Sequence, residues 1–217
     1  MACLHKFYED LYLDRLDFAP ITLIVGTFSP GWPASNTAQW FYGRTHDKYG
    51  RQNDNFWEVL PRVYGENSLI NSSTKEWKQF CKRHRIALTD LIACIDDANE
   101  SEPEHVALLG SYSDQAIATR FQYHTPVDLL QLLVTHPEIK NIYLTRRADE
   151  PFWKRLWQPV VRYVRIHNKY LTHLLTPSGY AFYQHGYYNK LHPEQPIERL
   201  ADFILSAWRA RWHDLST

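Results

Sequence analysis

Two short segments of the sequence end apolar runs in small and turn-forming residues, and loops of this composition commonly bind ligands. The first, GTFSPG (residues 26–31), follows the run LIV, and the second, TPSG (176–179), follows the run LTHLL. We interpret each run as a buried strand, and ligands of open α/β sheets bind at the carboxyl ends of such strands. Gly26, Pro30 and Gly31 predict a fixed turn with exposed backbone amides. The two segments are therefore expected to line one pocket.

A long polar loop between the first predicted strand and Asp54 contains a cluster of aromatic residues. Aromatic residues make up 15% of the chain, with 8 Trp and 14 Tyr, and most of them must pack in the core. In a polar loop, however, a flat ring is also a platform for a nucleobase. Loops longer than about 12–15 residues are usually functional or disordered, and the aromatic content of this loop argues against disorder. The cluster consists of Trp32, Trp40, Phe41, Tyr42 and Tyr49.

Two other kinds of site fit these loops poorly. A serine hydrolase is suggested by Ser29 and Ser178, but no G-x-S-x-G segment occurs, and Pro30 lacks the N–H that an oxyanion hole would need. A dinucleotide-binding loop would read G-x-G-x-x-G, and GTFSPG lacks the middle glycine. Neither class is favoured.

No metal site is predicted either. The three cysteines are too few and too far apart for zinc or iron–sulfur ligation. Asp90, Asp96 and Asp97 could suggest a two-metal nuclease, but the last two are adjacent in an acidic segment. Solvated surface is the simpler interpretation of that segment.

The composition is that of an ordinary globular protein. The chain has 217 residues, 44% of them hydrophobic and 22% charged, and we expect a single domain spanning residues 1–217. Its 24 basic and 24 acidic residues give no net charge, so no whole-protein field attracts nucleic acid or membrane. The segments KRHR (82–85) and TRR (145–147) are candidates for a local basic face. For KRHR, the solvated end of a helix is the simpler interpretation. Because no signal peptide or run of ~18 apolar residues appears, we expect a cytoplasmic protein without membrane contact. We also expect a monomer.

The order of the predicted elements indicates the fold. Apolar periodicity predicts helices, at residues 5–18, 55–65, 72–85, 126–137, 149–167 and 196–212. Asp54 or Asn53 is expected to cap the second of these helices, and a Ser/Thr cap with Glu76 forms a partial capping box at the third. Pro159 lies inside the helix predicted at 149–167. Apolar runs predict strands, at residues 21–25, 86–92, 139–145 and 170–176. Strands alternating with helices favour an α/β protein, a three-layer α/β/α sandwich with a central four-stranded parallel sheet.

Three segments together resemble the uracil-DNA glycosylase superfamily, and the mismatch-specific and hypoxanthine-type branches are nearest. They are GTFSPG after the first strand, FYGR…NFWEVL in the loop and following helix, and LTPSG after the last strand. The resemblance implies a DNA glycosylase that hydrolyses the N-glycosidic bond of a flipped, damaged or deaminated base, in base excision repair. It implies DNA as the partner and no cofactor, because this hydrolysis needs only water and charge stabilisation.

The resemblance also assigns roles to residues. Tyr42 falls where the family stacks an aromatic ring on the flipped base, whereas Phe56 and Trp57 are expected in the core. The implied base-binding residues are Gly26, Thr27, Phe28, Pro30, Gly31, Tyr42, Asn53 and Asn55. The implied DNA-binding residues are Pro177, Ser178, Gly179, Tyr180, His185 and Lys190.

Three polar positions depart from the family pattern, and they are the candidate catalytic residues. Ser29 stands where the family usually has the Asn or Asp that positions water, and a hydroxyl cannot act as a base. Asp54 occupies the asparagine position of Asn-x-Phe-Trp, where it could supply a carboxylate near the sugar or cap the following helix. Thr176 replaces an Asn or His that contacts the base. These changes leave two hypotheses. The protein is either a divergent glycosylase or a protein that binds a nucleobase or damaged strand without cleaving the N-glycosidic bond.

Overall fold

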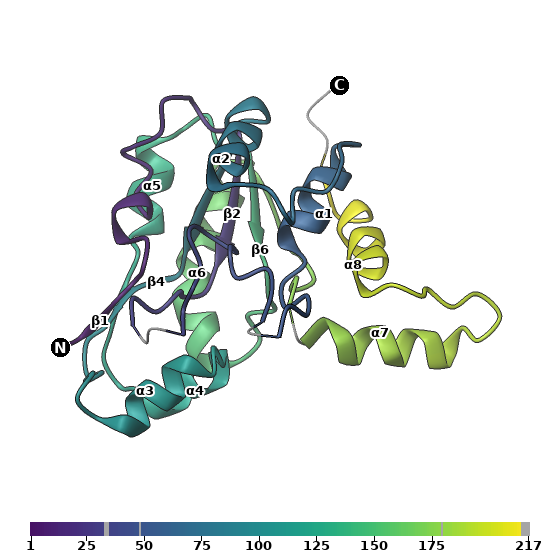
Figure 1. The fold of residues 1–217 in the computed structure, drawn as a ribbon. Helices are drawn as coiled ribbons and strands as arrows, with labels where there is room; N and C mark the ends of the chain where they lie inside the picture. The colour runs from purple at the N-terminus through teal and green to yellow at the C-terminus, as the bar shows by residue number, and fades with distance from the viewer. Residues whose placement is uncertain (33–34, 48, 179, 214–217) are drawn as a thin grey trace. The chain divides into compact units, whose positions relative to one another are not determined.

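The computed structural model describes residues 1–32, 35–47, 49–178 and 180–213. Helices and strands follow one another along the chain (Figure 1). Their order is β1 (Cys3–Leu4), η1 (Tyr8–Asp10), β2 (Thr22–Gly26), α1 (Phe56–Val63), α2 (Thr74–Arg83), β3 (Ile86–Asp90), β4 (Ile92–Ile95), α3 (Pro103–Gly110), α4 (Asp114–Arg120), β5 (His124–Pro126), α5 (Leu129–Thr135), β6 (Asn141–Leu144), α6 (Pro151–Ile166), β7 (Tyr170–His173), α7 (Tyr180–Leu191) and α8 (Leu200–Arg209).

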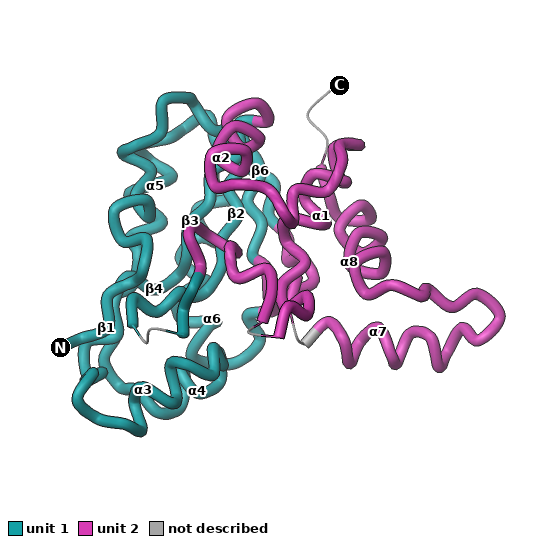
Figure 2. Tube along the Cα trace, in the orientation of Figure 1, with its two compact units in different colours: residues 1–37, 85–144, 148–171 teal, residues 38–84, 145–147, 172–217 magenta. Residues whose placement is uncertain are grey.

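The chain divides into two compact units, each assembled from separate stretches of sequence (Figure 2). Unit 1 comprises residues 1–37, 85–144 and 148–171. Unit 2 comprises residues 38–84, 145–147 and 172–217. The expectation of one domain over the whole chain stays a prediction.

A four-stranded parallel sheet confirms the predicted α/β fold. Its strands lie in the order β3-β2-β6-β7, and β2 pairs in parallel with both β3 and β6. Every residue of β2 is buried, which explains its continuous apolar sequence, since helices flank the sheet. In unit 1, α5 packs against α6, where the Tyr163 hydroxyl donates to the Leu133 carbonyl at 3.2 Å. The register sets Gly26 opposite Asp90, at the ends of their strands.

The predicted helix at residues 5–18 is wrong. This segment contains only the short η1, preceded by β1, which belongs to a three-stranded sheet in the order β1-β4-β5. The backbone N–H of His5 donates to the Ala93 carbonyl at 2.8 Å, and Leu13 has a positive φ of 65°. Strand pairing and a left-handed residue are both incompatible with a continuous helix. Apolar spacing alone did not reveal either.

The structure also differs from the prediction around residues 92–126. The predicted strand 86–92 divides into β3 and β4. The chain after the acidic segment forms α3 and α4, two helices that were not predicted. Pro103 is the first residue of α3, and Ser113 caps α4 by accepting from the Ala116 N–H. The fifth helix begins at Leu129 rather than Pro126, because Pro126 belongs to β5.

Unit 2 is held together by aromatic packing. Phe56 and Trp57 are fully buried, as predicted, and the Trp57 ring stacks on Trp77 at 4.9 Å between centroids. Helix α1 packs against α8. The predicted capping box of α2 is present, with the Ser73 hydroxyl and the Glu76 carboxylate bonded to each other's backbone amides. Helix α7 occupies a segment for which no helix was predicted.

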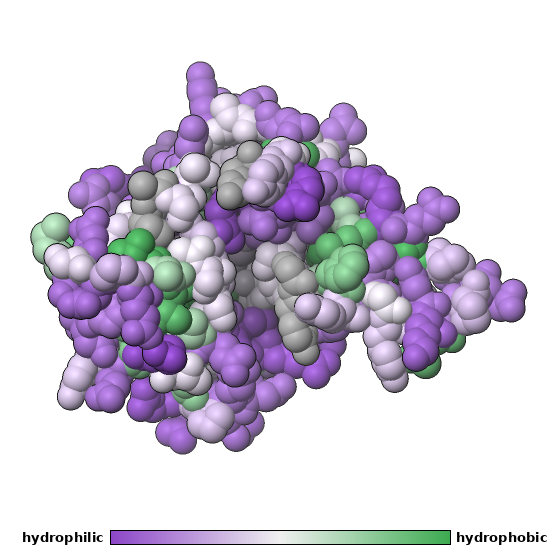
Figure 3. Space-filling model, turned by 60° about the horizontal axis from the view of Figure 1, so that its bottom comes forward, coloured by the Kyte–Doolittle hydropathy of each residue, from purple (hydrophilic) through white to green (hydrophobic). Residues whose placement is uncertain are grey.

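Hydrophilic side chains cover most of one face of the molecule (Figure 3). On the face drawn in Figure 3, hydrophilic residues prevail and hydrophobic ones form small separate groups. Within the described ranges, no helix is long and apolar enough to cross a membrane. The three cysteines are free thiols, and all of them are buried.

Candidate functional site

Tyr42 is held in an unusual conformation in unit 2. Its φ is 55°, in the left-handed region that bulky residues rarely adopt. Its ring stacks flat on Phe56, with centroids 3.8 Å apart and an interplanar angle of 2°. Its hydroxyl is 3.0 Å from the Thr145 hydroxyl, which is buried. Backbone strain of this kind is often retained at ligand-binding positions.

Asp54 is a half-buried carboxylate beside the same phenylalanine. Its Oδ1 accepts the Phe56 backbone N–H at 2.7 Å. Burial raises the pKa of Asp54 to about 7, although this hydrogen bond and the positive charge of Arg44 both act to lower it. Phe56 therefore joins the two candidate residues, stacking its ring on Tyr42 and donating its amide to Asp54. A carboxyl group with a pKa near neutrality can serve as base or acid at physiological pH.

The N-cap of α1 is neither of the two predicted residues, Asp54 and Asn53. Asn55 is the N-cap, and its own side chain makes no capping hydrogen bond. Both its backbone N–H and its side-chain Nδ2 donate to the Pro177 carbonyl, each at 2.9 Å. Asn53 is bonded within the loop, its backbone N–H donating to the Thr45 carbonyl at 2.8 Å.

The predicted second motif meets this loop. Asp54 and Ser178 form an isolated antiparallel bridge, which brings the residues around position 177 beside the start of α1. The hydroxyls of Thr176 and Ser178 are 3.2 Å apart. Two segments more than 120 positions apart in the sequence thus form one polar cluster within unit 2.

Three arginines belong to the segments that carry these candidate residues. Arg44 is close enough to Asp54 to influence its pKa. Arg146 and the exposed Arg147 directly follow Thr145, the partner of the Tyr42 hydroxyl. Residues 145–147 are one of the two candidate basic segments, and they belong to unit 2 although their neighbours in sequence belong to unit 1.

The loop after β2 lies in unit 1 and is closely fixed. The Gly26 carbonyl accepts from the Leu91 N–H at 3.1 Å, and the Thr27 hydroxyl donates to the Asp114 carboxylate at 2.7 Å. Gly31 donates its N–H to the Leu4 carbonyl at 2.8 Å, and a Cβ at this position would lie 2.7 Å from that oxygen. Glycine is therefore required by a close backbone approach.

Ser29 and Pro30 are held by one asparagine. Asn36 is buried, and its Nδ2 donates to the Ser29 hydroxyl at 3.1 Å and to the Pro30 carbonyl at 2.7 Å. Within the described chain, no residue accepts a hydrogen bond from the backbone N–H of Phe28 or Ser29. The N–H groups of Phe28 and Ser29 thus remain as donors in this loop, whereas the Gly31 N–H, which was predicted to be exposed, donates to Leu4.

Sequence reasoning missed a buried pair beneath this loop. His5 Nε2 lies 2.7 Å from an Asp90 oxygen, and both side chains are buried. Because His5 Nδ1 accepts the Phe7 N–H at 3.0 Å, Nε2 carries the proton and donates to Asp90. The His5 ring also meets the Phe28 ring edge-on at 5.7 Å. No sequence signal links residues 85 positions apart.

The remaining predicted residues are placed as follows. His185 was expected on an exposed phosphate-binding surface. Instead it is buried, and its Nε2 lies 2.5 Å from the Ile197 carbonyl. Lys190 is exposed on α7. Gly179 and the side chain of Tyr180 lie outside the described residues. Convergence of Ser29 with Asp54 stays a prediction. Among the described residues, no group of three or more His, Cys, Asp or Glu could hold a metal ion.

The fold is similar to that of a solved protein. The solution NMR structure of a putative uracil DNA glycosylase from Methanosarcina acetivorans matches this chain with a TM-score of 0.51 and 17% sequence identity. The match covers 91% of this chain and 94% of that one. At this identity the likeness is one of fold. No protein-family model matches the sequence, and no curated protein does so either.

Proposed function

We propose that this protein is a DNA glycosylase that hydrolyses the N-glycosidic bond of a flipped, damaged or deaminated base, in base excision repair. The observation that carries the proposal is the Asp54 carboxyl, half-buried next to a stacked aromatic pair, with a pKa of about 7. The fold likeness to a putative uracil DNA glycosylase supports it.

The residues of unit 2 match the needs of this reaction. A base taken out of the duplex is held by stacking on an aromatic ring, and Tyr42 presents a ring whose plane is fixed by Phe56. As the base leaves with the bonding electrons, positive charge develops on the sugar. The ionised form of Asp54 stabilises that charge and accepts a proton from the water that adds to C1′.

The surroundings of Asp54 suit a polyanionic substrate. Arg44 acts on Asp54 directly, and Arg146 and Arg147 follow Thr145, whose hydroxyl meets that of Tyr42. The Thr176 and Ser178 hydroxyls are additional donors for phosphate oxygens, which receive most protein–DNA hydrogen bonds.

The test is release of a base from labelled oligonucleotides. Substrates contain uracil, hypoxanthine, xanthine or mismatches, in single and double strands, and alkali converts abasic sites into strand breaks. We expect breaks with the wild type and a roughly 10²- to 10⁴-fold lower rate with Asp54→Asn. Because the carboxylate must be ionised, the wild-type rate rises with pH through about 7. The matched control is Asp47→Asn, an aspartate in the same loop that is bonded to Arg51.

A second candidate function is binding of a nucleobase or damaged strand without cleavage. Ser29 favours it, because its hydroxyl accepts from Asn36 and cannot act as a base. Absence of strand breaks with the wild type, together with breaks with Ser29→Asn, would support this alternative. Wild-type rates retained by Asp54→Asn would remove Asp54 from the mechanism.

A further inference from the structure

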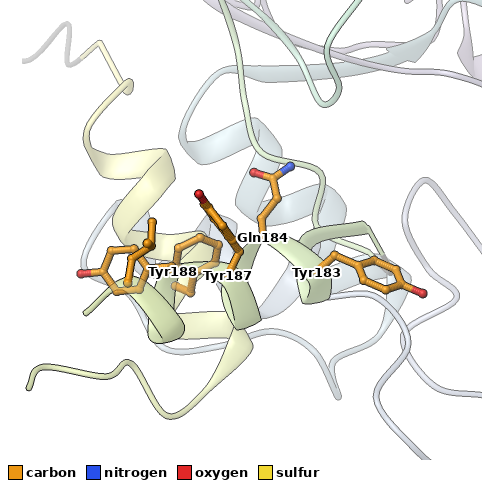
Figure 4. A pocket seen from close by; sticks show the side chains of 6 residues that line it. Tyr183, Gln184, Tyr187 and Tyr188 are labelled. Carbon is orange, nitrogen blue, oxygen red and sulfur yellow. The ribbon is translucent and has the colours of Figure 1, made fainter. Parts of the chain in front are cut away.

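Helix α7 and α8 form a shallow aromatic hollow in unit 2, separate from the polar cluster around Asp54. Its volume is about 460 Å³, and it is lined by Tyr183, Gln184, Tyr187, Tyr188, Leu191 and Phe203. The Tyr188 and Phe203 rings pack against each other at 5.4 Å. Figure 4 shows the side chains of Tyr183, Gln184, Tyr187 and Tyr188 projecting from α7, with the Tyr183 and Tyr188 rings pointing in opposite directions.

The tyrosines at the rim are unusually exposed. Tyr183 is 74% exposed and Tyr187 is 65% exposed. They are four residues apart, so they lie on the same side of the helix, roughly 6 Å apart along its axis. Exposed large side chains grouped in this way commonly mark a binding surface. Two exposed aromatic rings with polar tips, one helical turn apart, suit a ligand that is itself a row of flat rings.

The charge of α7 points to an anion. The helix, YAFYQHGYYNKL, contains no acidic residue, and Lys190 is exposed one turn beyond Tyr187. Helix α7 also follows directly on the segment of Thr176 and Ser178, which belongs to the proposed site. Aromatic platforms combined with cations are how proteins bind single-stranded nucleic acid without sequence preference.

We propose that α7 binds a stretch of single-stranded nucleic acid, with bases stacked on Tyr183 and Tyr187 and a phosphate paired with Lys190. The inference rests on the proposed function, because that function makes nucleic acid the ligand. The inference adds a substrate class to that function, namely single-stranded nucleic acid. In a duplex the base faces are already stacked on one another, so this surface selects unpaired nucleotides beside the damaged base.

Binding of an undamaged, fluorescently labelled oligonucleotide tests the inference by anisotropy. We expect tighter binding to the single strand than to the same sequence in a duplex. Tyr183→Leu and Tyr187→Leu keep an apolar side chain but remove the ring, and each weakens single-strand binding roughly 5- to 100-fold. Tyr183→Phe and Tyr187→Phe retain it. Lys190→Gln lowers the slope of log affinity against log salt by about 0.7.

The matched control is Tyr123→Leu, which removes a tyrosine of unit 1 that is 65% exposed; it leaves binding unchanged. Equal binding by the wild type and both leucine variants would overturn the inference. So would leucine variants that alter the sedimentation coefficient and not oligonucleotide binding, since α7 would then contact a second copy of the chain. Thermal melts of the variants verify that they are folded.

The same variants separate this inference from the proposed function. Asp54→Asn loses base release and keeps single-strand binding if both are correct. Strand binding that depends on the tyrosines, in a protein that releases no base, would contradict the activity and leave the surface in place. Base release by a protein whose strand binding does not depend on the tyrosines would support the activity and contradict the proposed surface.

Discussion

Phe56 contacts one candidate residue through its backbone amide and another through its ring. Each of these two residues carries a free-energy cost, one from the burial of a carboxyl and one from a strained backbone. Asp54 accepts the amide and is a carboxyl whose burial raises its pKa, while Tyr42 stacks on the ring with a positive φ. Such local costs are expected where a site must be held ready for a ligand. The sequence pointed to both residues as candidates. It could not show the burial of Asp54 or the strain of Tyr42, because both depend on segments distant in the sequence.

Asp54 makes the stability of the protein depend on pH. Its pKa is about 7 in the folded chain, against an ordinary value of 3.8. Below about pH 4 the carboxyl is protonated in both states, and from there to about pH 7 ionisation of the unfolded chain favours unfolding. Urea denaturation should therefore show Asp54→Asn gaining stability over the wild type across this range, by up to about 4 kcal/mol.

For Asp47, the dependence of stability on pH has the opposite sign. Hydrogen bonds from the Arg51 backbone and side chain lower the pKa of Asp47, so its contribution is present above its ordinary pKa and lost on acidification. Asp47→Asn should accordingly lose stability at neutral pH relative to the wild type. If the stability of Asp54→Asn changed with pH in parallel with that of the wild type, the burial of the Asp54 carboxyl would be contradicted.

The hydrogen bond between the Tyr42 and Thr145 hydroxyls should contribute measurably to stability. Tyr42→Phe and Thr145→Val each remove one partner, and because Thr145 is buried we expect each to cost about 1–3 kcal/mol. The double variant should cost less than the sum, and urea denaturation of all four proteins measures the coupling. Additive effects would mean that the two hydroxyls, 3.0 Å apart, do not stabilise each other.

Elements were predicted well where capping signals and long apolar periodicity agree. The capping box at Ser73 and the long α6 with its internal Pro159 are both present. The predicted helix over residues 5–18 is wrong because pairing of β1 with β4 overrides local spacing. Helix α7 was missed because its aromatic residues are spread around the helix and leave no apolar stripe to recognise.

Two glycines test how elements depend on backbone freedom. Gly31 approaches the Leu4 carbonyl so closely that Gly31→Ala should displace β1 and cost about 1–3 kcal/mol. Gly186 lies inside α7 with no atom within 4 Å of a Cβ, so Gly186→Ala should stabilise the protein by about 0.5–1 kcal/mol. Urea midpoints of the two variants that shift in the same direction would refute this assignment.

At the scale of the whole molecule, the two units share one interleaved chain. The chain passes from one unit to the other after residues 37, 84, 144, 147 and 171. Because each unit is built from segments joined through the other, unfolding one unit frees the ends of the segments that form the other. We therefore expect a single cooperative unfolding transition. Composition and element order could not predict this interleaving, since it depends on long-range packing.

Amide hydrogen exchange measures this cooperativity. The slowest amides of β2 in unit 1 and of α8 in unit 2 should exchange with the same free energy of opening. Gly31→Ala, a change confined to unit 1, should lower the protection of both elements equally. Unchanged protection of α8 would show that the units open independently.

The buried thiols described above have a practical consequence for chemistry on this protein. Burial raises the pKa of Cys3 and Cys81 and raises that of Cys94 to about 12, so alkylating reagents find no reactive thiolate while the chain is folded. The rate of alkylation then reports opening of the native structure without any added probe. A cysteine placed at an exposed position such as 187 would become a unique attachment point for a dye or a cross-linker.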